Sequence, residues 1–275
     1  NMPALERIIS DDYPTFSGIA LERWFRCRMM ESFKYQQIGG WWLVGNRIKN
    51  QAGHNDDFEI DIVAETIDGD TIHVLQAVAD ETGVAVCSSF ICAESADTVH
   101  SALFNRGFFL RPNDLPTFVD KAHLYAHGGE DRFFRAGNAQ TVIAYKGVKM
   151  RLLICYDLRF PVWARNQHGD DFDILLVSAN WPECRINYWD ALIAARGTEN
   201  QCYICGANPV GDDGLGLHYN GHSIAYDTHL NPLVAFQDNE EGTQIAELDI
   251  DKLHHFREAL PLWKDADKFV MNRIL

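Results

Sequence analysis

The chain has 275 residues and a formal net charge of −15, from 24 Lys and Arg against 39 Asp and Glu. Apolar residues make up 47% of the chain and charged residues 23%, a composition that excludes an intrinsically disordered protein. So acidic a protein repels polyanions, which excludes nucleic acid and anionic membrane surfaces as expected partners. No apolar run approaches the ~18 residues of a membrane span, and no signal-peptide pattern is expected at the N-terminus.

Seven cysteines are scattered through the chain without a regular framework. An odd and dispersed set is not typical of a disulfide-stapled secreted domain, so we predict free thiols and a cytoplasmic location. Cys202 and Cys205 form a C-x-x-C pair inside an apolar β-like run, where they would point to opposite faces and act as structural residues. No repeat or flexible linker divides the chain, which predicts a single domain over residues 1–275.

Helical and extended apolar patterns alternate along the first third of the chain. Apolar residues at helical spacing predict a helix over about Leu21–Tyr35, and a second helix opens at Asp68–Thr71. Short apolar runs predict strands at Trp41–Val44 and Val84–Phe90.

The later segments continue the alternation and add hairpins. Two hairpins are expected, joining Phe104–Leu110 to Thr117–Val119 and Thr141–Tyr145 to Val148–Ile154. Further strands are expected at Asp173–Ser178, Cys202–Gly206, Ser223–Tyr226 and Thr243–Leu248, and helices at Tyr188–Asn200 and around Leu253–Phe256. Crossovers mixed with hairpins favour an α/β fold with mixed sheets.

The most informative segment is Leu152–Pro161, where an apolar strand runs into Cys155 and then a polar turn closed by proline. A strand end is a rigid platform from which a nucleophile projects into the cleft beyond the sheet edge. A buried structural cysteine is the alternative, and it is the commoner fate of a free cysteine.

Several other segments favour a catalytic over a structural role for Cys155. Lys121 follows a predicted hairpin and Glu130 lies nine residues beyond it; Ala179–Pro182 ends the next buried strand; Arg196 and Glu199–Gln201 end a helix. This ordered set resembles the nitrilase (carbon–nitrogen hydrolase) superfamily over about residues 64–269. The segments C155-Y-D-L-R-F-P-V-W, A179-N-W-P and W263-K-D-A-D-K-F resemble its ω-amidase subgroup.

The resemblance implies an α-β-β-α four-layer sandwich with a Glu-Lys-Cys catalytic set and no cofactor. By motif match Cys155 is the nucleophile, Lys121 is the lysine, and Glu130 is a second glutamate kept beside them. The implied reaction is hydrolysis of the terminal amide of a small α-keto acid ω-amide, such as 2-oxoglutaramate, to a carboxylate and ammonia. The resemblance also implies a homodimer.

The chemistry of these residue types supports the same roles. A nearby ammonium lowers the pKa of a thiol, and the thiolate is the attacking species. Lys121 and the backbone N–H of Tyr156 are candidate donors to an oxyanion, and departing ammonia requires a general acid or base. Arg159 is a candidate clamp for a substrate carboxylate, or else part of a structural salt bridge. Candidate cavity walls, or plain packing residues, are Phe160, Asn180 and Trp181.

The first glutamate of the resembled family is not found. Its position falls on Asn46, just after the Trp41–Val44 strand, or on Asn50 by counting back from Ala64, and residues 1–60 match the family poorly. Three explanations stay open: the base is another carboxylate (Asp56, Asp57 or Glu59), the base is absent, or the sequence of this region contains an error. A missing base costs about 10²–10⁴-fold in rate.

Two alternatives to an ω-amidase follow. The chain is another carbon–nitrogen hydrolase, such as an N-carbamoyl amidase or a nitrilase, or it is a nitrilase-fold binding protein without turnover. No metal is expected: His123 and His127 lie four residues apart, but in a loop-rich segment that favours a cavity wall or the surface over zinc.

Overall fold

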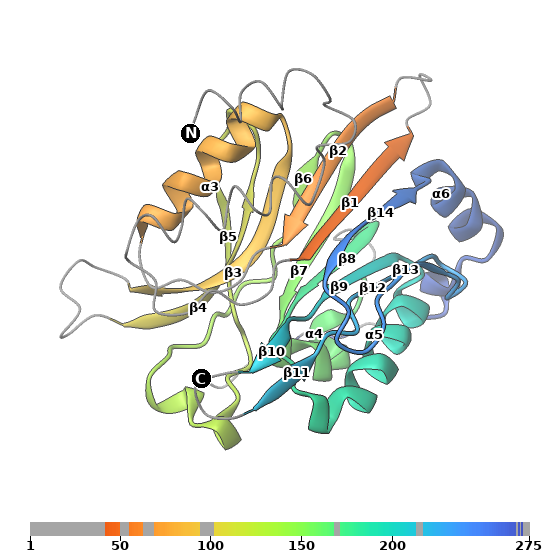
Figure 1. Cartoon of the computed structure of the whole chain (residues 1–275). Helices are drawn as coiled ribbons and strands as arrows, with labels where there is room; N and C mark the ends of the chain where they lie inside the picture. Colours follow the sequence, from red (N-terminus) through yellow and green to blue (C-terminus); the bar gives the residue numbers. More distant parts are fainter. Residues whose placement is uncertain are drawn as a thin grey trace.

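The computed structural model describes residues 42–49, 55–62, 69–93, 102–167, 171–212, 217–267, 269 and 271. Two six-stranded sheets lie at its centre, with helices on their outer faces (Figure 1). The predicted helix over Leu21–Tyr35 lies outside the described residues.

The first sheet has the order β14-β1-β2-β3-β4-β5. Its β1–β14 and β2–β3 pairs are parallel and its other pairs are antiparallel, so the sheet is mixed as predicted. Its strands are β1 (Trp42–Lys49), β2 (Asn55–Ile62), β3 (Ala85–Ala93), β4 (Leu103–Leu110), β5 (Thr117–Asp120) and β14 (Gly242–Leu248).

The second sheet has the order β13-β12-β9-β8-β7-β6. The central strands β7, β8 and β9 run parallel, and the flanking pairs are antiparallel. The strands are β6 (Ile143–Tyr145), β7 (Val148–Ile154), β8 (Ile174–Ser178), β9 (Tyr203–Ala207), β12 (Ile224–Tyr226) and β13 (Pro232–Ala235). A separate ribbon joins β10 (Val210–Asp212) to β11 (His218–Asn220).

Helices connect and cover these sheets. The α-helices are α3 (Gly69–Thr82), α4 (Pro161–Ala164), α5 (Ile186–Asn200) and α6 (Ile250–Ala259). The 3₁₀ helices are η1 (Ala126–Gly128), η2 (Glu130–Arg132), η3 (Cys155–Arg159), η4 (Glu183–Arg185) and η5 (Leu262–Lys264).

Three apolar clusters define the layers. Side chains of α3, such as Leu75, pack on the outer face of β3 and β4. Side chains of β3 and β4 meet those of β7 and β8 between the sheets, as Phe109 and Leu176 do. Trp189 of α5 packs with α4 on the outer face of the second sheet. The order is helix, sheet, sheet, helix, which confirms the predicted α-β-β-α sandwich (Figure 1).

Most predicted elements of the described residues are present with shifts of one to three residues at their ends. The strand predicted at Trp41–Val44 is the exception, because β1 continues to Lys49. Asn46 therefore lies inside the strand, paired with Phe58 of β2 and Ala246 of β14, and not in a loop after it. Asn50 lies outside the described residues.

The described cysteines are all free thiols: Cys87, Cys92, Cys155, Cys184, Cys202 and Cys205. The C-x-x-C pair is split between two cores as predicted, because Cys202 packs on the helical side of the second sheet and Cys205 packs between the sheets. None of the helices in the described ranges is long and apolar enough to cross a membrane.

Gly107 of β4 lies directly against side chains of β7 in the other sheet. A Cβ added there would lie 2.6 Å from Leu152 Cδ2 and 3.3 Å from Ile154 Cδ1, both on β7. We predict that Gly107→Ala lowers the free energy of unfolding by about 1–3 kcal/mol through overpacking, measured by urea denaturation. Gly242→Ala is the matched control, since its Cβ would meet only Phe236 Cε1 at 3.7 Å. Equal losses in the two variants would contradict the interpretation.

Candidate active site

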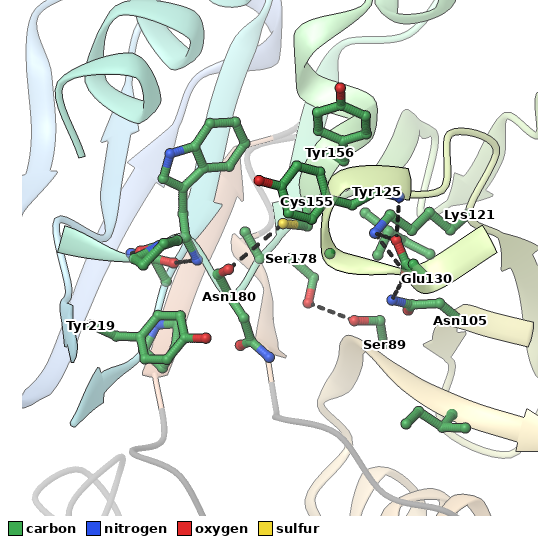
Figure 2. A pocket seen from close by; sticks show the side chains of 18 of the residues that line it. Ser89, Asn105, Lys121, Tyr125, Glu130, Cys155, Tyr156, Ser178, Asn180 and Tyr219 are labelled. Atoms are coloured by element: carbon green, nitrogen blue, oxygen red, sulfur yellow. Dashed lines mark hydrogen bonds and ion pairs between the residues drawn. The ribbon is translucent and has the colours of Figure 1, made fainter. Parts of the chain in front are cut away.

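Chemically useful side chains follow the ends of several strands at one edge of the sandwich. Cys155 follows β7, Asn180 lies two residues after β8, and Asn208 follows β9. These strands are parallel neighbours, so their carboxyl ends meet at the same edge. Lys121 directly follows β5 of the other sheet. The site is therefore built from both sheets (Figure 2).

Cys155 begins η3 with a φ of 44°, in the left-handed region that few non-glycine residues occupy. Its Sγ lies 3.8 Å from the carbonyl oxygen of Asn180. In Figure 2 the sulfur lies between Asn180 and the group formed by Lys121 and Glu130. A strained backbone at a strand end is typical of a residue placed for chemistry.

Lys121 and Glu130 form a buried ion pair. The Lys121 Nζ donates to Glu130 Oε1 at 2.8 Å and to Oε2 at 2.6 Å, and the lysine is only 4% exposed. Glu130 also accepts from Asn105 Nδ2 at 3.2 Å and from the backbone N–H of Tyr125 at 2.6 Å. These four bonds satisfy a carboxylate that would otherwise be costly to bury.

Asp157 ties the lysine segment to the cysteine turn. Its carboxylate accepts the backbone N–H groups of Ala122 at 3.4 Å, His123 at 2.8 Å and Ile154 at 3.3 Å. It also lies 2.8 Å from His123 Nδ1 and is itself only 3% exposed. One side chain thus fixes the residues that adjoin Lys121 and Cys155. Sequence reasoning read Asp157 only as part of the cysteine motif.

A cavity of about 540 Å³ contains these groups. The predicted residues Cys155, Lys121, Glu130, Tyr156, Arg159, Asn180 and Trp181 all line it. At its base, Ser89 of β3 and Ser178 of β8 place their Oγ atoms 3.1 Å apart, which joins the two sheets by a polar contact (Figure 2).

Phe160 does not line this cavity. Its ring stacks on His123 with centroids 3.7 Å apart and planes 10° apart, and it meets the edge of Tyr156 at 5.2 Å. The expectation that Phe160 forms a cavity wall is therefore corrected, because His123 and Tyr156 take up its ring faces. Phe160 supports Tyr156, which does border the cavity.

Arg159 lies against aromatic rings. Its guanidinium carbon is 5.3 Å from the Trp181 ring centre and 5.0 Å from that of Tyr188. Among the described residues no carboxylate forms an ion pair with it, so the salt bridge expected as the alternative is not seen there. A stacked guanidinium keeps its in-plane N–H donors available to a ligand.

Two further lining residues escaped sequence reasoning. Asn208 accepts the backbone N–H of Trp181 at 2.6 Å and donates to its carbonyl at 2.9 Å, which fixes the turn that carries Asn180. The strand-end argument could have found it, since it follows β9 as Cys155 follows β7. Arg185 on η4 also lines the cavity, and its guanidinium lies 5.6 Å from the Tyr125 ring centre.

Glu130 is the only carboxylate among the lining residues whose side chains the structure describes, which do not include those of β1 and β2. The candidates Asp56, Asp57 and Glu59 lie on β2, where their backbones pair with Ile48, Arg47 and Gly45 of β1. No group of three or more His, Cys, Asp or Glu side chains in the described ranges could hold a metal ion. His123 instead contacts Asp157 and Phe160.

A family model described as Carbon-nitrogen hydrolase matches residues 38–258. The chain belongs to the carbon–nitrogen hydrolase family. The match spans the described strands β1–β14 and every site residue named above, so the family predicted from the motifs is confirmed.

Curated relatives narrow the reaction of this carbon–nitrogen hydrolase. The omega-amidase YafV of Escherichia coli K12 is 41% identical over 187 residues, which cover 66% of this chain and 71% of the relative. The 2-oxoglutaramate amidase of Bacillus subtilis is 29% identical over 194 residues, covering 70% and 73%. The chain is therefore a hydrolase that acts on amide bonds.

Solved structures agree on the fold of this carbon–nitrogen hydrolase. XC1258 from Xanthomonas campestris, a CN-hydrolase superfamily protein with an arsenic adduct in its active site, matches with a TM-score of 0.71. The identity is 27%, over 92% of this chain and 93% of that chain. Saccharomyces cerevisiae Nit3, of the nitrilase superfamily, matches with a TM-score of 0.60 at 22% identity, covering 71% and 72%, and shows the fold alone.

Burial raises the pKa of the Cys155 thiol above its ordinary value of 9.0, although the Lys121 ammonium opposes the shift. The thiol is therefore protonated at neutral pH, and its reaction requires removal of the proton. We predict that the rate of Cys155 alkylation by iodoacetamide rises with pH through 9.0. Peptide mass spectrometry measures the rate, and exposed Cys184 serves as an internal reference. A plateau below about pH 8 would instead indicate a preformed thiolate.

Proposed function

We propose that this carbon–nitrogen hydrolase removes the terminal amide of a small α-keto acid ω-amide, such as 2-oxoglutaramate, to give a carboxylate and ammonia. The observation that carries the proposal is that Cys155, Lys121 and Glu130 line one cavity together. Its volume of about 540 Å³ suits a small substrate. The names of the relatives, omega-amidase and 2-oxoglutaramate amidase, support the substrate class.

The first half of the reaction forms an acyl-enzyme. Cys155 Sγ attacks the amide carbon, and its proton passes to Glu130 as the C–S bond forms. The Lys121 ammonium and the backbone N–H of Tyr156 stabilise the oxyanion. When the C–N bond breaks, Glu130 returns the proton to the departing nitrogen, which leaves as ammonia.

The second half of the reaction consumes water. Glu130 takes a proton from a water molecule, which attacks the thioester carbon and forms the C–O bond of the product. Collapse of this intermediate breaks the C–S bond, and the proton returns to Cys155. Glu130 is assigned both proton transfers because it is the single carboxylate among the lining residues whose side chains the structure describes.

The far end of the substrate meets Arg159. A guanidinium donates two parallel N–H bonds to one carboxylate, which fixes both its position and its orientation. Stacking on Trp181 and Tyr188 holds the guanidinium plane in place for this contact. Tyr156, Asn180 and Trp181 complete the walls around the chain of the substrate.

Ammonia release from 2-oxoglutaramate tests the proposal, with Cys155→Ala as the matched control. We expect steady release by the natural chain and none above background by the variant. A natural-chain rate equal to that of the variant would contradict turnover at Cys155 and favour a binding protein. Release from an N-carbamoyl compound or a nitrile, and not from 2-oxoglutaramate, would favour another carbon–nitrogen hydrolase.

Intact mass spectrometry tests the intermediate. If the first glutamate of the family has no substitute in this chain and hydrolysis of the thioester is slowed as a result, we expect an acyl adduct to accumulate on Cys155 during incubation with 2-oxoglutaramate. An unmodified thiol, in a chain that releases ammonia slowly, would place the slow step at acylation instead.

We also propose that the protein is a cytoplasmic homodimer. Large apolar side chains are exposed on and beside the helices of the second sheet: Val162, Tyr188, Leu260, Leu262 and Trp263. A second copy of this chain would cover such side chains. Light scattering should show particles of twice 31.2 kDa, and particles of 31.2 kDa alone would reject the dimer. The free thiols of the described cysteines support a reducing compartment.

A further inference from the structure

Two arginines, Arg159 and Arg185, line the cavity. Arg159 is on η3, which begins at the nucleophile, and Arg185 is on η4, after the turn that follows β8. Both side chains are partly buried. Only Arg159 was predicted to contact substrate, and the role of Arg185 is the subject of this inference.

Backbone hydrogen bonds and an aromatic ring, and not an ion pair with a carboxylate, hold Arg185 in place. Its carbonyl accepts the Trp181 Nε1–H at 2.8 Å, and its N–H donates to the Pro182 carbonyl at 2.9 Å, so its backbone is fixed to the cavity turn. Its guanidinium lies 5.6 Å from the centre of the Tyr125 ring, and the centre of that ring lies 5.0 Å from the ring centre of Tyr156, the residue after the nucleophile. Arg185 is therefore connected through Tyr125 to the turn that carries the reactive cysteine.

The in-plane donors of Arg185 have no carboxylate partner among the described residues. Some other arginines do have one: Arg106 bonds to Asp120, Arg196 to Glu199 and Arg257 to Asp173. A guanidinium left without an acceptor at a cavity wall is free to bind an anionic ligand.

The described side chains that line the cavity carry more positive than negative charge. Among its described residues are Lys121, Arg159 and Arg185 as cations and Glu130 as the single carboxylate. Glu130 is already paired with Lys121 at 2.6 Å. Two guanidinium charges therefore remain for the substrate, which favours an anion and disfavours a cation where they contact it.

We propose that Arg185 is a substrate-binding residue that acts with Arg159 to select α-keto acid amides over α-amino acid amides. The two guanidinium groups share the carboxylate and the adjacent keto oxygen, both of which are hydrogen-bond acceptors. The α-ammonium of an amino acid amide offers no acceptor and repels both arginines. This inference rests on the proposed function, since it deepens the substrate class of the same site.

The test compares kcat/KM for three amides: 2-oxoglutaramate, L-glutamine and the uncharged pentanamide. In Arg185→Gln we expect the preference for 2-oxoglutaramate over pentanamide to fall about 10- to 100-fold, mainly through KM, as for a lost charge-assisted hydrogen bond. The preference for 2-oxoglutaramate over glutamine should fall roughly tenfold, because one repulsive charge is removed. Arg185→Lys should retain part of both preferences.

Arg132→Gln is the matched control. Arg132 lies on η2, is exposed, and does not line the cavity. This control variant should leave both preferences unchanged. Equal losses on all three amides in Arg185→Gln would indicate a structural role and overturn the proposal. Unchanged preferences in that variant would overturn it as well.

Binding separates failure of this inference from failure of the proposed function. Calorimetric titration of Cys155→Ala with 2-oxoglutarate needs no turnover, and adding Arg185→Gln should weaken binding by the same 10- to 100-fold. If the natural chain releases no ammonia but this shift in binding is found, the proposed function fails and Arg185 keeps its role. If ammonia is released and binding of 2-oxoglutarate does not shift, Arg185 has no role in recognition.

Discussion

Replacing Lys121 with methionine should lower kcat/KM for amide hydrolysis by about 10³-fold. The variant loses the ammonium that opposes the raised pKa of Cys155 and that faces the oxyanion. It also leaves the Glu130 carboxylate without its bidentate partner at 2.8 and 2.6 Å. The free energy of unfolding should fall by about 3–5 kcal/mol for that uncompensated buried charge. Ammonia-release kinetics and urea denaturation measure the two effects.

A double variant separates charge burial from chemistry. Lys121→Met with Glu130→Gln removes both charges, so it should recover much of the lost stability and none of the lost activity. Lys149→Met is the surface control, because Lys149 contacts Asp171 at 3.5 Å with both side chains about half exposed. Activity that returns with stability in the double variant would show that Lys121 acts only as a structural ion pair.

Replacing Asp157 with alanine should destabilise the protein and misplace both halves of the site. Three backbone N–H groups, of Ala122, His123 and Ile154, lose their acceptor in a buried position. Each such donor costs about 1–3 kcal/mol, so we expect the free energy of unfolding to fall by about 3–9 kcal/mol for the three. Because these residues adjoin Lys121 and Cys155, kcat should fall by about 10²-fold.

Asp157→Asn keeps one carbonyl acceptor and should lie between the natural chain and the alanine variant in both measurements. Asp171→Ala is the control, because Asp171 is a half-exposed aspartate with one weak surface contact. A stable Asp157→Ala protein with natural activity would contradict the view that this carboxylate joins the two catalytic segments.

Strand ends are the part of the site that the sequence predicts well. The apolar run of β7 stops at Cys155, and that of β8 stops before Asn180, so the pattern places both at strand ends, while the family resemblance singled them out for chemistry. Lys121 was also found by that resemblance, and the structure places it directly after β5. Parallel pairing of β7 with β8 then brings these positions together.

Side-chain direction is the part that the sequence does not contain. Phe160 was expected in the cavity wall, and its ring instead stacks on His123, a contact made across 37 residues of chain. Arg185 was not singled out, because nothing local marks a guanidinium whose support is the distant ring of Tyr125. Such contacts depend on how two separate segments pack, which no local pattern specifies.

The amino-terminal strands show a related limit. The unbroken apolar run ends at Val44, so the strand was expected to end there, yet β1 continues through the mixed segment Gly45–Lys49. Pairing on both sides, with β2 and β14, supports this extension. Tertiary pairing therefore overrides the local pattern at Asn46.

The left-handed backbone at Cys155 limits which nucleophiles this position can accept. A residue with a Cβ pays about 1–2 kcal/mol at such a φ, and a β-branched residue pays more. Serine is unbranched like cysteine, so it adopts this backbone conformation at the same energetic cost. Threonine is branched at Cβ, and its side chain would clash with its own backbone. Evolution can therefore replace the cysteine nucleophile with serine at this turn, but not with threonine.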